Sequence, residues 1–380
     1  MKRNDERVQI KNMDEFCMAL EMEYEIREMD ASKKMQKEIF SYLQERSSSA
    51  FHMLSLAECY YLGFGVEENP DEAFLWCKKA AEAKDARAQF YLGTSYELGM
   101  KVEQDSVEAV QWYQKSAQQG NIEALCRLGI CYQHGKGILK DIDQAVQCYQ
   151  KAAEQGHAIA QYQLGMCYEF GEGVEQDEKK AVDYYQKSAH QGYALAQCSL
   201  AYCYDKGKGV EPDMRKAFEW YRFSARQGNE YAQNRLGEYY AMGMGTIKEA
   251  RHWYQRAAQL GNKDAQFHLG LCYDSGQGVE QDDEKAFFWY QKAAEQGHVR
   301  AQYNLGVKYD FGKGVTKDEK KAFECYRSAA QQGYADAQYN LAVCYAKGEG
   351  TESSEEDAIY WLKKAAQQGH ERAKQVLESL

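Results

Sequence analysis

The residues of this 380-residue chain best suited to chemistry are its 12 cysteines, because a thiol can form a disulfide, bind zinc or act as a nucleophile. Six of them occupy equivalent places, each directly before a tyrosine: Cys59, Cys131, Cys167, Cys203, Cys272 and Cys344. A residue repeated in this way is expected to be a small buried hydrophobe. Cys126 and Cys131 are five residues apart, which on a helix points them about 140° from each other, so we expect no shared zinc ion.

The eight histidines and the glycine-rich stretches provide no catalytic set either. His157, His298 and His370 share one place, directly after a recurrent glycine, where a loop or helix-cap role is expected. A GxGV sequence recurs, but it lacks the third glycine and the preceding strand of a dinucleotide site. The chain contains no HExxH motif, phosphate-binding loop, serine nucleophile elbow or calcium-loop pattern. We therefore expect no enzyme activity, no metal and no cofactor.

These residues recur because the chain is built from one repeated unit, well represented by QYQLGMCYEFGEGVEQDEKKAVDYYQKSAHQG at 161–192. The unit is 36 residues long, and nine copies can be followed: 50–85, 86–121, 122–157, 158–193, 194–229, 230–262, 263–298, 299–334 and 335–370. The sixth copy is three residues shorter, and its short loop is expected either to alter the local stacking angle or, the alternative we favour, to lie on the outer rim. This period is typical of stacked repeats, in which each unit buries its apolar face only against its neighbours.

Each unit is predicted to be a helical hairpin. Counted from the first residue of each copy, positions 3, 7, 8 and 11 are small or apolar, which is the spacing of one helical face. The second half again has apolar residues at helical spacing and follows a recurrent aspartate, a preferred N-cap residue: Asp105, Asp141, Asp177, Asp213, Asp282 and Asp318. GxGV lies between the two halves, and a glycine such as Gly192 follows the second helix in the place of a left-handed C-cap.

Small and large residues at fixed places of the unit predict how the two helices pack. Position 8 of the first helix is glycine in six of nine copies and alanine in the other three, which predicts a close approach between helices. All six tryptophans share one place in the second helix: Trp76, Trp112, Trp220, Trp253, Trp289 and Trp361. We expect these aromatic residues to serve packing.

The pattern AxYxLGxxYxxGxGVxxDxxKAxxWYxKAAxQG resembles the Sel-one-like repeat, a relative of the tetratricopeptide repeat, over about 320 residues. The resemblance implies an all-α fold, an α/α solenoid in the form of a right-handed superhelix, and a role as an adaptor or scaffold for protein complexes. A cysteine-rich secreted branch of the family carries cysteine pairs eight residues apart that bridge consecutive helices. No two cysteines here have that separation, so neither disulfides nor the penicillin-related activity of that branch are expected.

The composition limits the choice of partner. The chain has 47 Lys plus Arg against 58 Asp plus Glu, a net charge of −11, which disfavours nucleic acid and favours a neutral or basic protein or peptide. No apolar run reaches the roughly 18 residues that span a membrane. The first 16 residues lack the apolar core of a secretory signal, so we expect no membrane insertion and a cytoplasmic location.

Two segments lie outside the repeats. In residues 1–49, the stretches 13–30 and 33–46 have apolar residues at helical spacing, and the second is expected to pack on the first repeat. We interpret residues 1–49 as an N-terminal cap or, alternatively, as a docking segment whose acidic face meets a partner. Residues 371–380 repeat only the start of a first helix and are interpreted as a C-terminal capping helix.

A variable stripe of the first helix, at positions 2, 6, 9 and 13, lies opposite its core face. The resemblance places first helices on the concave side of the superhelix. Positions 9 and 13 supply two apolar clusters, one of Ile130, Met166, Phe170 and Tyr202 and one of Leu271, Val307 and Phe311. We predict a groove there for the apolar anchors of a partner. The alternative is that curvature partly buries these side chains against neighbouring first helices.

Polar residues flank the predicted groove. Position 6 supplies Arg127, Gln163, Arg235, His268, Asn304 and Asn340, and position 12 supplies Glu97, Glu169, Asp205, Asp274 and Asp310. These groups would set register and charge preference, although the acids can equally form a solvated rim. The predicted partner-binding residues are Arg127, Ile130, His134, Gln163, Met166, Phe170, Tyr202, Leu271, Val307 and Phe311.

The function predicted from the sequence is non-catalytic binding of a partner peptide or protein on the concave surface. One alternative is an effector that acts on host proteins by binding. The other is a hydrolase-like activity of the kind found in cysteine-rich relatives.

Overall fold

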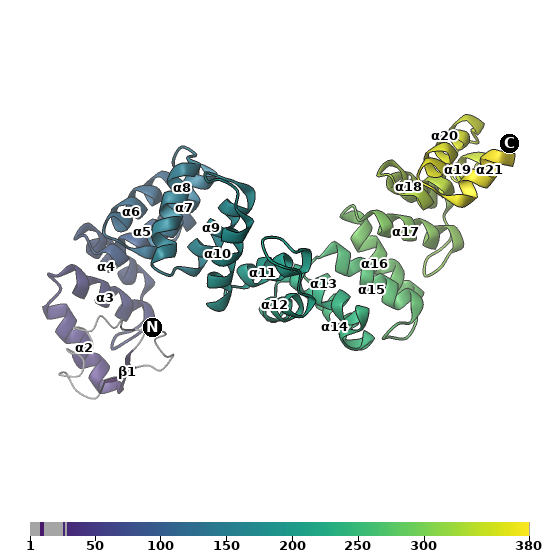
Figure 1. The fold of residues 1–380 in the computed structure, drawn as a ribbon. Coiled ribbons are helices and arrows are strands. Elements are labelled where there is room, and N and C mark those ends of the chain that lie inside the picture. The colour runs from purple at the N-terminus through teal and green to yellow at the C-terminus, as the bar shows by residue number, and fades with distance from the viewer. Residues whose placement is uncertain (1–7, 11–25, 27–28, 380) are drawn as a thin grey trace. The chain divides into compact units, whose positions relative to one another are not determined.

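The computed structural model describes residues 8–10, 26 and 29–379 of the chain. Its residues divide into two compact units, 1–191 and 192–380, and the boundary falls two residues before the end of the fourth repeat. Apart from two three-residue strands, the described residues form an all-α solenoid of stacked helical hairpins, as predicted (Figure 1).

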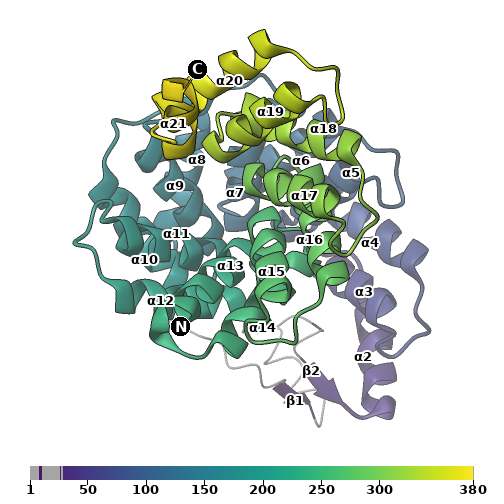
Figure 2. The same cartoon turned by 90° about the vertical axis from the view of Figure 1, so that its right-hand side faces the viewer.

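In the first unit, each first helix packs against the second helix that follows it. The elements are β1 (Val8–Ile10), β2 (Met29–Ala31), α2 (Lys33–Glu45), α3 (Ala50–Leu62), α4 (Pro70–Glu82), α5 (Ala86–Leu98), α6 (Ser106–Gln118), α7 (Ile122–His134), α8 (Ile142–Glu154), α9 (Ala158–Phe170) and α10 (Glu178–His190). Strands β1 and β2 pair in parallel and lie beside α2 (Figure 2).

The second unit continues the same pairing. Its elements are α11 (Ala194–Lys206), α12 (Met214–Arg226), α13 (Glu230–Tyr239), the π-helix η2 (Tyr240–Met244), α14 (Ile247–Gln259), α15 (Lys263–Ser275), α16 (Asp283–Glu295), α17 (Val299–Phe311), α18 (Glu319–Gln331), α19 (Ala335–Lys347), α20 (Glu355–Gln367) and α21 (Glu371–Ser379). The shortened loop of the sixth repeat is exposed over residues 241–249, in agreement with the expected place on the rim.

The recurrent aspartates are N-caps, as predicted. Asp318, for example, accepts a hydrogen bond from the backbone N–H of Lys321, and the Lys321 ammonium lies 3.4 Å from the same carboxylate and 5.3 Å from the centre of the Tyr309 ring. One lysine thus joins the cap of the second helix to a tyrosine of the first. Gly192 has a φ of 92° after α10, which confirms the left-handed residue expected at this helix end.

The close approach at position 8 is made by a tyrosine of the second helix. A Cβ atom added at Gly165 would lie 2.8 Å from the ring of Tyr185, and the other five glycines at this position face a tyrosine in the same way. The facing tyrosines are almost completely buried: Tyr113, Tyr149, Tyr185, Tyr254, Tyr290 and Tyr326. The six tryptophans, which stand directly before this tyrosine or the residue in its place, are only partly buried. Tyrosine therefore forms the centre of the repeats that carry it.

A ladder of glutamine side chains ties consecutive repeats together. Gln266 at position 4 donates from Nε2 to the carbonyl of Ala258 in the preceding repeat, at 3.2 Å. Its Oε1 accepts at 2.8 Å from Gln296, which ends the second helix of its own repeat. The same paired bonds recur in the second, fourth, eighth and ninth repeats. In these five repeats, stacking therefore satisfies both ends of the glutamine amide.

The N-terminal segment agrees only in part with the prediction. Helix α2 forms where expected, and Ile39, Phe40 and Leu43 pack with Leu56 and Cys59 of the first repeat. The helix predicted over 13–30 lies mostly outside the described residues, but its end is wrong, because Met29–Ala31 is a strand that pairs with Val8–Ile10. The strand forms because its backbone pairs with a segment about twenty residues earlier in the chain. The spacing of apolar residues within 13–30 contains no information about that pairing.

Candidate protein-binding surface

The predicted binding residues lie on the first helices and differ in exposure. Four are exposed, namely Arg127, His134, Phe170 and Phe311, and the other six are partly buried. Within the apolar set, Ile130, Leu271 and Val307 each pack against the buried core of a repeat. These three side chains therefore contribute to packing as well as to the surface.

The predicted four-residue cluster spans the two units. Ile130, Met166 and Phe170 belong to the first unit, whereas Tyr202 belongs to the second. In the second unit, the Tyr202 ring lies 5.3 Å from the Lys208 ammonium. The two units thus carry separate parts of the predicted surface.

Position 13 carries exposed apolar side chains in five repeats, four at the end of a first helix and one, Met242, in η2. Their relative exposures are 46% for Leu62, 61% for Leu98, 60% for Phe170, 66% for Met242 and 68% for Phe311. Most of these residues end their helix immediately before a left-handed glycine, such as Gly171 or Gly312. They have no core neighbour to cover them, and exposed apolar groups of this size are typical of interaction surfaces.

The acids at position 12 are structural partners of the buried tyrosines. The hydroxyl of Tyr113 donates to Glu97 at 2.6 Å, Tyr185 donates to Glu169 at 2.6 Å, and the same bond recurs in the seventh and eighth repeats. Interpretation of these acids as a solvated rim is therefore wrong. A buried hydroxyl needs an acceptor, and an acid on the first helix of the same hairpin supplies it.

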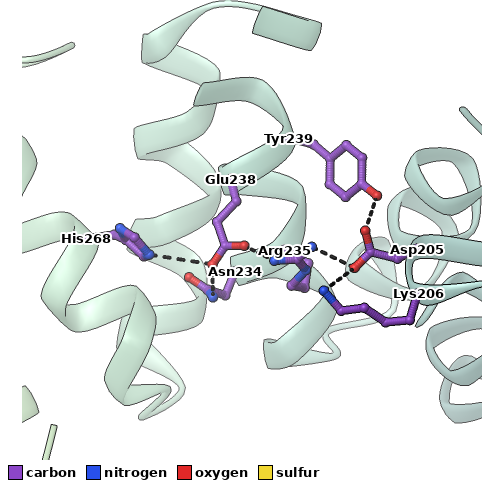
Figure 3. Close-up of polar contacts among 7 residues, drawn as sticks. All are labelled: Asp205, Lys206, Asn234, Arg235, Glu238, Tyr239 and His268. Carbon is purple, nitrogen blue, oxygen red and sulfur yellow. Dashed lines mark hydrogen bonds and ion pairs between the residues drawn. The ribbon is translucent and has the colours of Figure 1, made fainter. Parts of the chain in front are cut away.

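A connected set of charges crosses three first helices of the second unit (Figure 3). Arg235 on α13 donates to Asp205 of α11 at 2.7 Å and to Glu238 on its own helix. On the far side, Glu238 lies 3.5 Å from Nε2 of His268 on α15. The set, which we name the Arg235 network, also includes Asn234, Tyr239 and Lys206.

Partial burial makes the Arg235 network stronger than a surface ion pair. Burial opposes ionisation of Glu238, but the hydrogen bond from His268 and the charge of Arg235 outweigh it and lower the pKa of that carboxyl. Burial likewise acts against the charge of Arg235, and the two acids reverse the effect, so its pKa is raised. Glu238 and Arg235 therefore stay charged near neutral pH and hold each other in place.

Two further members of the polar framework were missed in the sequence, although both stand at the recurrent cysteine position. The hydroxyl of Tyr239 donates a hydrogen bond to Asp205 at 2.7 Å. Asp205 belongs to the fifth repeat, where Tyr221 stands in the place of the tyrosine that bonds this acid in other repeats. Lys308 is only 2% exposed, and its ammonium lies 2.5 Å from both Asp274 and Asp283. The sequence could have indicated both residues, because each replaces the cysteine that is usual at position 10.

A shallow depression of about 400 Å³ lies between the first helices of the last two repeats and the C-terminal helix. Its lining comes from α17, α19 and the start of α21: Tyr303, Asp336, Tyr339, Asn340, His370, Glu371 and Arg372. The lining is polar, and in it Nε2 of His370 lies 3.4 Å from a carboxylate oxygen of Asp336. It could accept a polar side chain of a partner.

We also searched the described residues for other kinds of site. Across 8–10, 26 and 29–379, no group of three His, Cys, Asp or Glu side chains is placed to hold a metal ion. None of the helices formed by these residues is long and apolar enough to cross a membrane. The eleven described cysteines are free thiols, and burial raises the pKa of Cys131 and Cys167 to about 11.

Comparison with known proteins identifies the repeat. The family model described as the Sel1 repeat matches residues 52–85, 86–121, 122–157, 158–193, 194–229, 230–262, 263–298, 299–334 and 335–370. The solved structure of c5321, a protective antigen present in uropathogenic Escherichia coli strains and displaying an SLR fold, is 36% identical, with 95% of this chain and 73% of that chain covered and a TM-score of 0.75. A Sel1 repeat protein from Oxalobacter formigenes is 31% identical over 89% of each chain, with a TM-score of 0.39. No curated protein sequence matches the chain.

Proposed function

Because the chain belongs to the Sel1 repeat family, we propose that it is a non-catalytic scaffold that binds a partner protein or peptide through the exposed stripe of its first helices. The observation that carries this proposal is the series of exposed apolar residues at position 13, set on a framework of repeats whose buried residues hardly vary. A rigid framework with variable exposed residues suits recognition, because little entropy is lost when the partner binds.

The chemistry of the stripe supports a partner with apolar anchors. Phe170 and Phe311 can each bury a large ring against an apolar side chain of the partner, which is the usual source of binding free energy at an interface. The Arg235 network and the depression beside His370 supply polar groups that fix orientation. The net charge of −11 favours a neutral or basic partner.

The helices that flank the array are proposed to cap it. A Cβ atom added at Gly65 would lie 2.1 Å from the carbonyl oxygen of Gln36 in α2. Gly314 meets Asp283 of α16, the preceding second helix, in the same way. Helix α2 thus takes the place of a second helix, and α21 covers the other end, where Ala373 packs with Leu362 and Ala365.

Affinity capture with three matched variants tests the proposal. One variant carries Leu98→Glu and Phe170→Glu in the first unit, and another carries Met242→Glu and Phe311→Glu in the second. The control carries Phe288→Glu and Tyr360→Glu, which are 47% and 51% exposed but lie on second helices. Circular dichroism and thermal melting first establish that all three fold as the wild type does.

The proposal predicts that wild type and control capture the same partner from a lysate of the source cells. One or both of the first two variants should capture at least tenfold less of it. Loss of the partner with the control alone would place binding on the second helices. Equal capture by all three variants would contradict a role of the stripe. Turnover of a substrate by the purified chain, abolished by a single polar substitution, would contradict the non-catalytic function.

A further inference from the structure

Three helices of the chain begin with a histidine that acts as their N-cap: His157 before α9, His298 before α17 and His370 before α21. In each, the imidazole Nδ1 accepts a hydrogen bond of 3.1 or 3.2 Å from the backbone N–H three residues later. A ring nitrogen accepts only while it carries no proton. Each of these caps therefore requires the neutral imidazole with its proton on Nε2.

Each capping histidine is accompanied by an acid at position 2 of the repeat that precedes its helix. Nε2 of His298 lies 3.5 Å from Asp264, and Nε2 of His370 lies 3.4 Å from Asp336. The charge of Glu123 acts on His157. In the other six repeats the following cap is Asp, Asn or Tyr, and position 2 holds no acid: Phe51, Arg87, Ile159, Leu195, Tyr231 and Arg300. A negative charge close to Nε2 favours the tautomer that carries its proton there and leaves Nδ1 free to cap.

The surroundings of His298 favour its neutral form. The ring stacks on Phe267 at 4.5 Å, and burial is the main effect that lowers its pKa. Asp264 opposes the shift, whereas His268 and Lys263 on the same helix add to it. The positive end of α17 also disfavours a cation at its N-cap.

The other two caps have comparable surroundings. Burial lowers the pKa of His157, with Glu123 acting against this shift and Arg127 acting with it. The ring of His370 stacks on Tyr339 at 4.6 Å and faces Asp336 on α19 and Glu371 on its own helix. His298 and His370 are thus each held between an aromatic ring and a carboxylate, and His157 lies within reach of the charge of Glu123.

We propose that these three junctions are acid-sensitive: a proton on Nδ1 removes the cap and releases the first turn of α9, α17 and α21. The proton comes from solvent, and no covalent bond changes. Junctions capped by asparagine before α7, α13 and α15 lack a titratable cap and keep it. Acid therefore loosens the array at three defined places, two of which flank the first-helix stripe of the last repeats.

The sign of the effect follows from proton binding. A histidine whose pKa is lowered by folding binds fewer protons in the folded state than in the unfolded state. Its contribution to stability is complete above the ordinary histidine pKa of about 6.5 and is lost as pH falls through the folded value. Aspartate caps such as Asp318 have a lowered pKa and stay ionised in this range.

Hydrogen exchange followed by mass spectrometry on the full chain, at pH 7.5 and pH 5.0 with correction for intrinsic exchange, tests the proposal. We expect the amides in the first turns of α9, α17 and α21 to lose about three- to tenfold in protection at pH 5.0, the effect of losing an N-cap. The first turns of α7, α13 and α15 should keep theirs. Equal losses in all six helices, or no loss at the histidine-capped ones, would overturn it.

A single substitution provides the second test. His298→Asn installs the residue that already caps three equivalent helices, so the variant is expected to fold. In this variant α17 should keep its protection at pH 5.0, while α9 and α21 still respond to acid. An unchanged acid response of α17 would contradict the role of its histidine.

Discussion

The ring of Tyr290 lies so close to Gly270 that a Cβ atom on residue 270 would be 2.6 Å from two ring carbons. The same contact accounts for two of the three repeats that carry alanine at this position. Ala57 and Ala342 stand where the second helix provides Cys77 and Leu362 in place of the tyrosine. In the fifth repeat Ala201 does face a tyrosine, and there the acid Asp205 is bound by Tyr239 instead.

We predict that Gly270→Ala lowers the free energy of unfolding by about 2 kcal/mol, the usual cost of overpacking a rigid core. Chemical denaturation followed by circular dichroism measures the change. The control is Gly270→Ala combined with Tyr290→Leu, which recreates the pair Ala342 and Leu362. The two substitutions should cost less together than the sum of their separate effects. Strict additivity would show that the ring does not impose the glycine.

The sixth repeat lacks one bond of the glutamine ladder. Oε1 of Gln233 is buried without a hydrogen-bond partner among the described residues, because Leu260 stands where other repeats have the donating glutamine. Leu260→Gln should therefore raise the free energy of unfolding by about 1 kcal/mol. The Leu260 side chain is 57% exposed, so little apolar burial is lost by the change.

The reverse substitution in the next repeat is the matched control. Gln296→Leu removes the donor to Gln266 and should lower the free energy of unfolding by a similar amount, about 1 kcal/mol. Thermal melting of both variants beside wild type is sufficient. If Leu260→Gln has no effect while Gln296→Leu destabilises, the unpaired Gln233 is satisfied in solution by another group.

Lys308 and its two acids should respond unequally to substitution. The lysine is buried, whereas the side chains of Asp274 and Asp283 are 35% and 39% exposed. The double variant Asp274→Asn, Asp283→Asn leaves the buried lysine ammonium without a compensating charge. It should lower the free energy of unfolding by about 3 kcal/mol. Lys308→Cys introduces the residue that is usual at this position and leaves two acids that water can hydrate. It should lower the free energy of unfolding by less than about 1.5 kcal/mol. Denaturant titration that ranks these variants in the opposite order would contradict this account.

The aspartate caps should make stability fall in strong acid. Backbone hydrogen bonds from the first turn lower the pKa of Asp318 below its ordinary value of 3.8, so the unfolded chain binds more protons there. The stabilisation is present above that value and is lost as pH falls through the lowered pKa. Asp318→Asn keeps a capping oxygen that does not titrate. Between pH 5 and pH 3, monitored by circular dichroism, this variant should lose less stability than wild type, and an equal loss would exclude the cap as a cause.

The amino-acid sequence by itself determined the repeat, its two helices, the N-cap aspartates and the close approach at position 8. These features depend on neighbours within one hairpin, and helical spacing, cap preference and residue size report them directly. The pairing of capping histidines with acids at position 2 is also visible in the sequence, but its meaning depends on knowing that both side chains share one junction.

Only the tertiary structure decided how the polar residues are used. Asp205 reads as a surface acid, yet Arg235 and Tyr239, from the next repeat, converge on it. Gln266 reads as an ordinary helix residue, yet it is buried and bonded to two other repeat positions. Partners 16 residues apart meet across the two helices of one hairpin, and partners 30 or 34 residues apart meet where helices pack in the assembled repeats. That geometry comes from core packing of many residues at once, so no local pattern carries it.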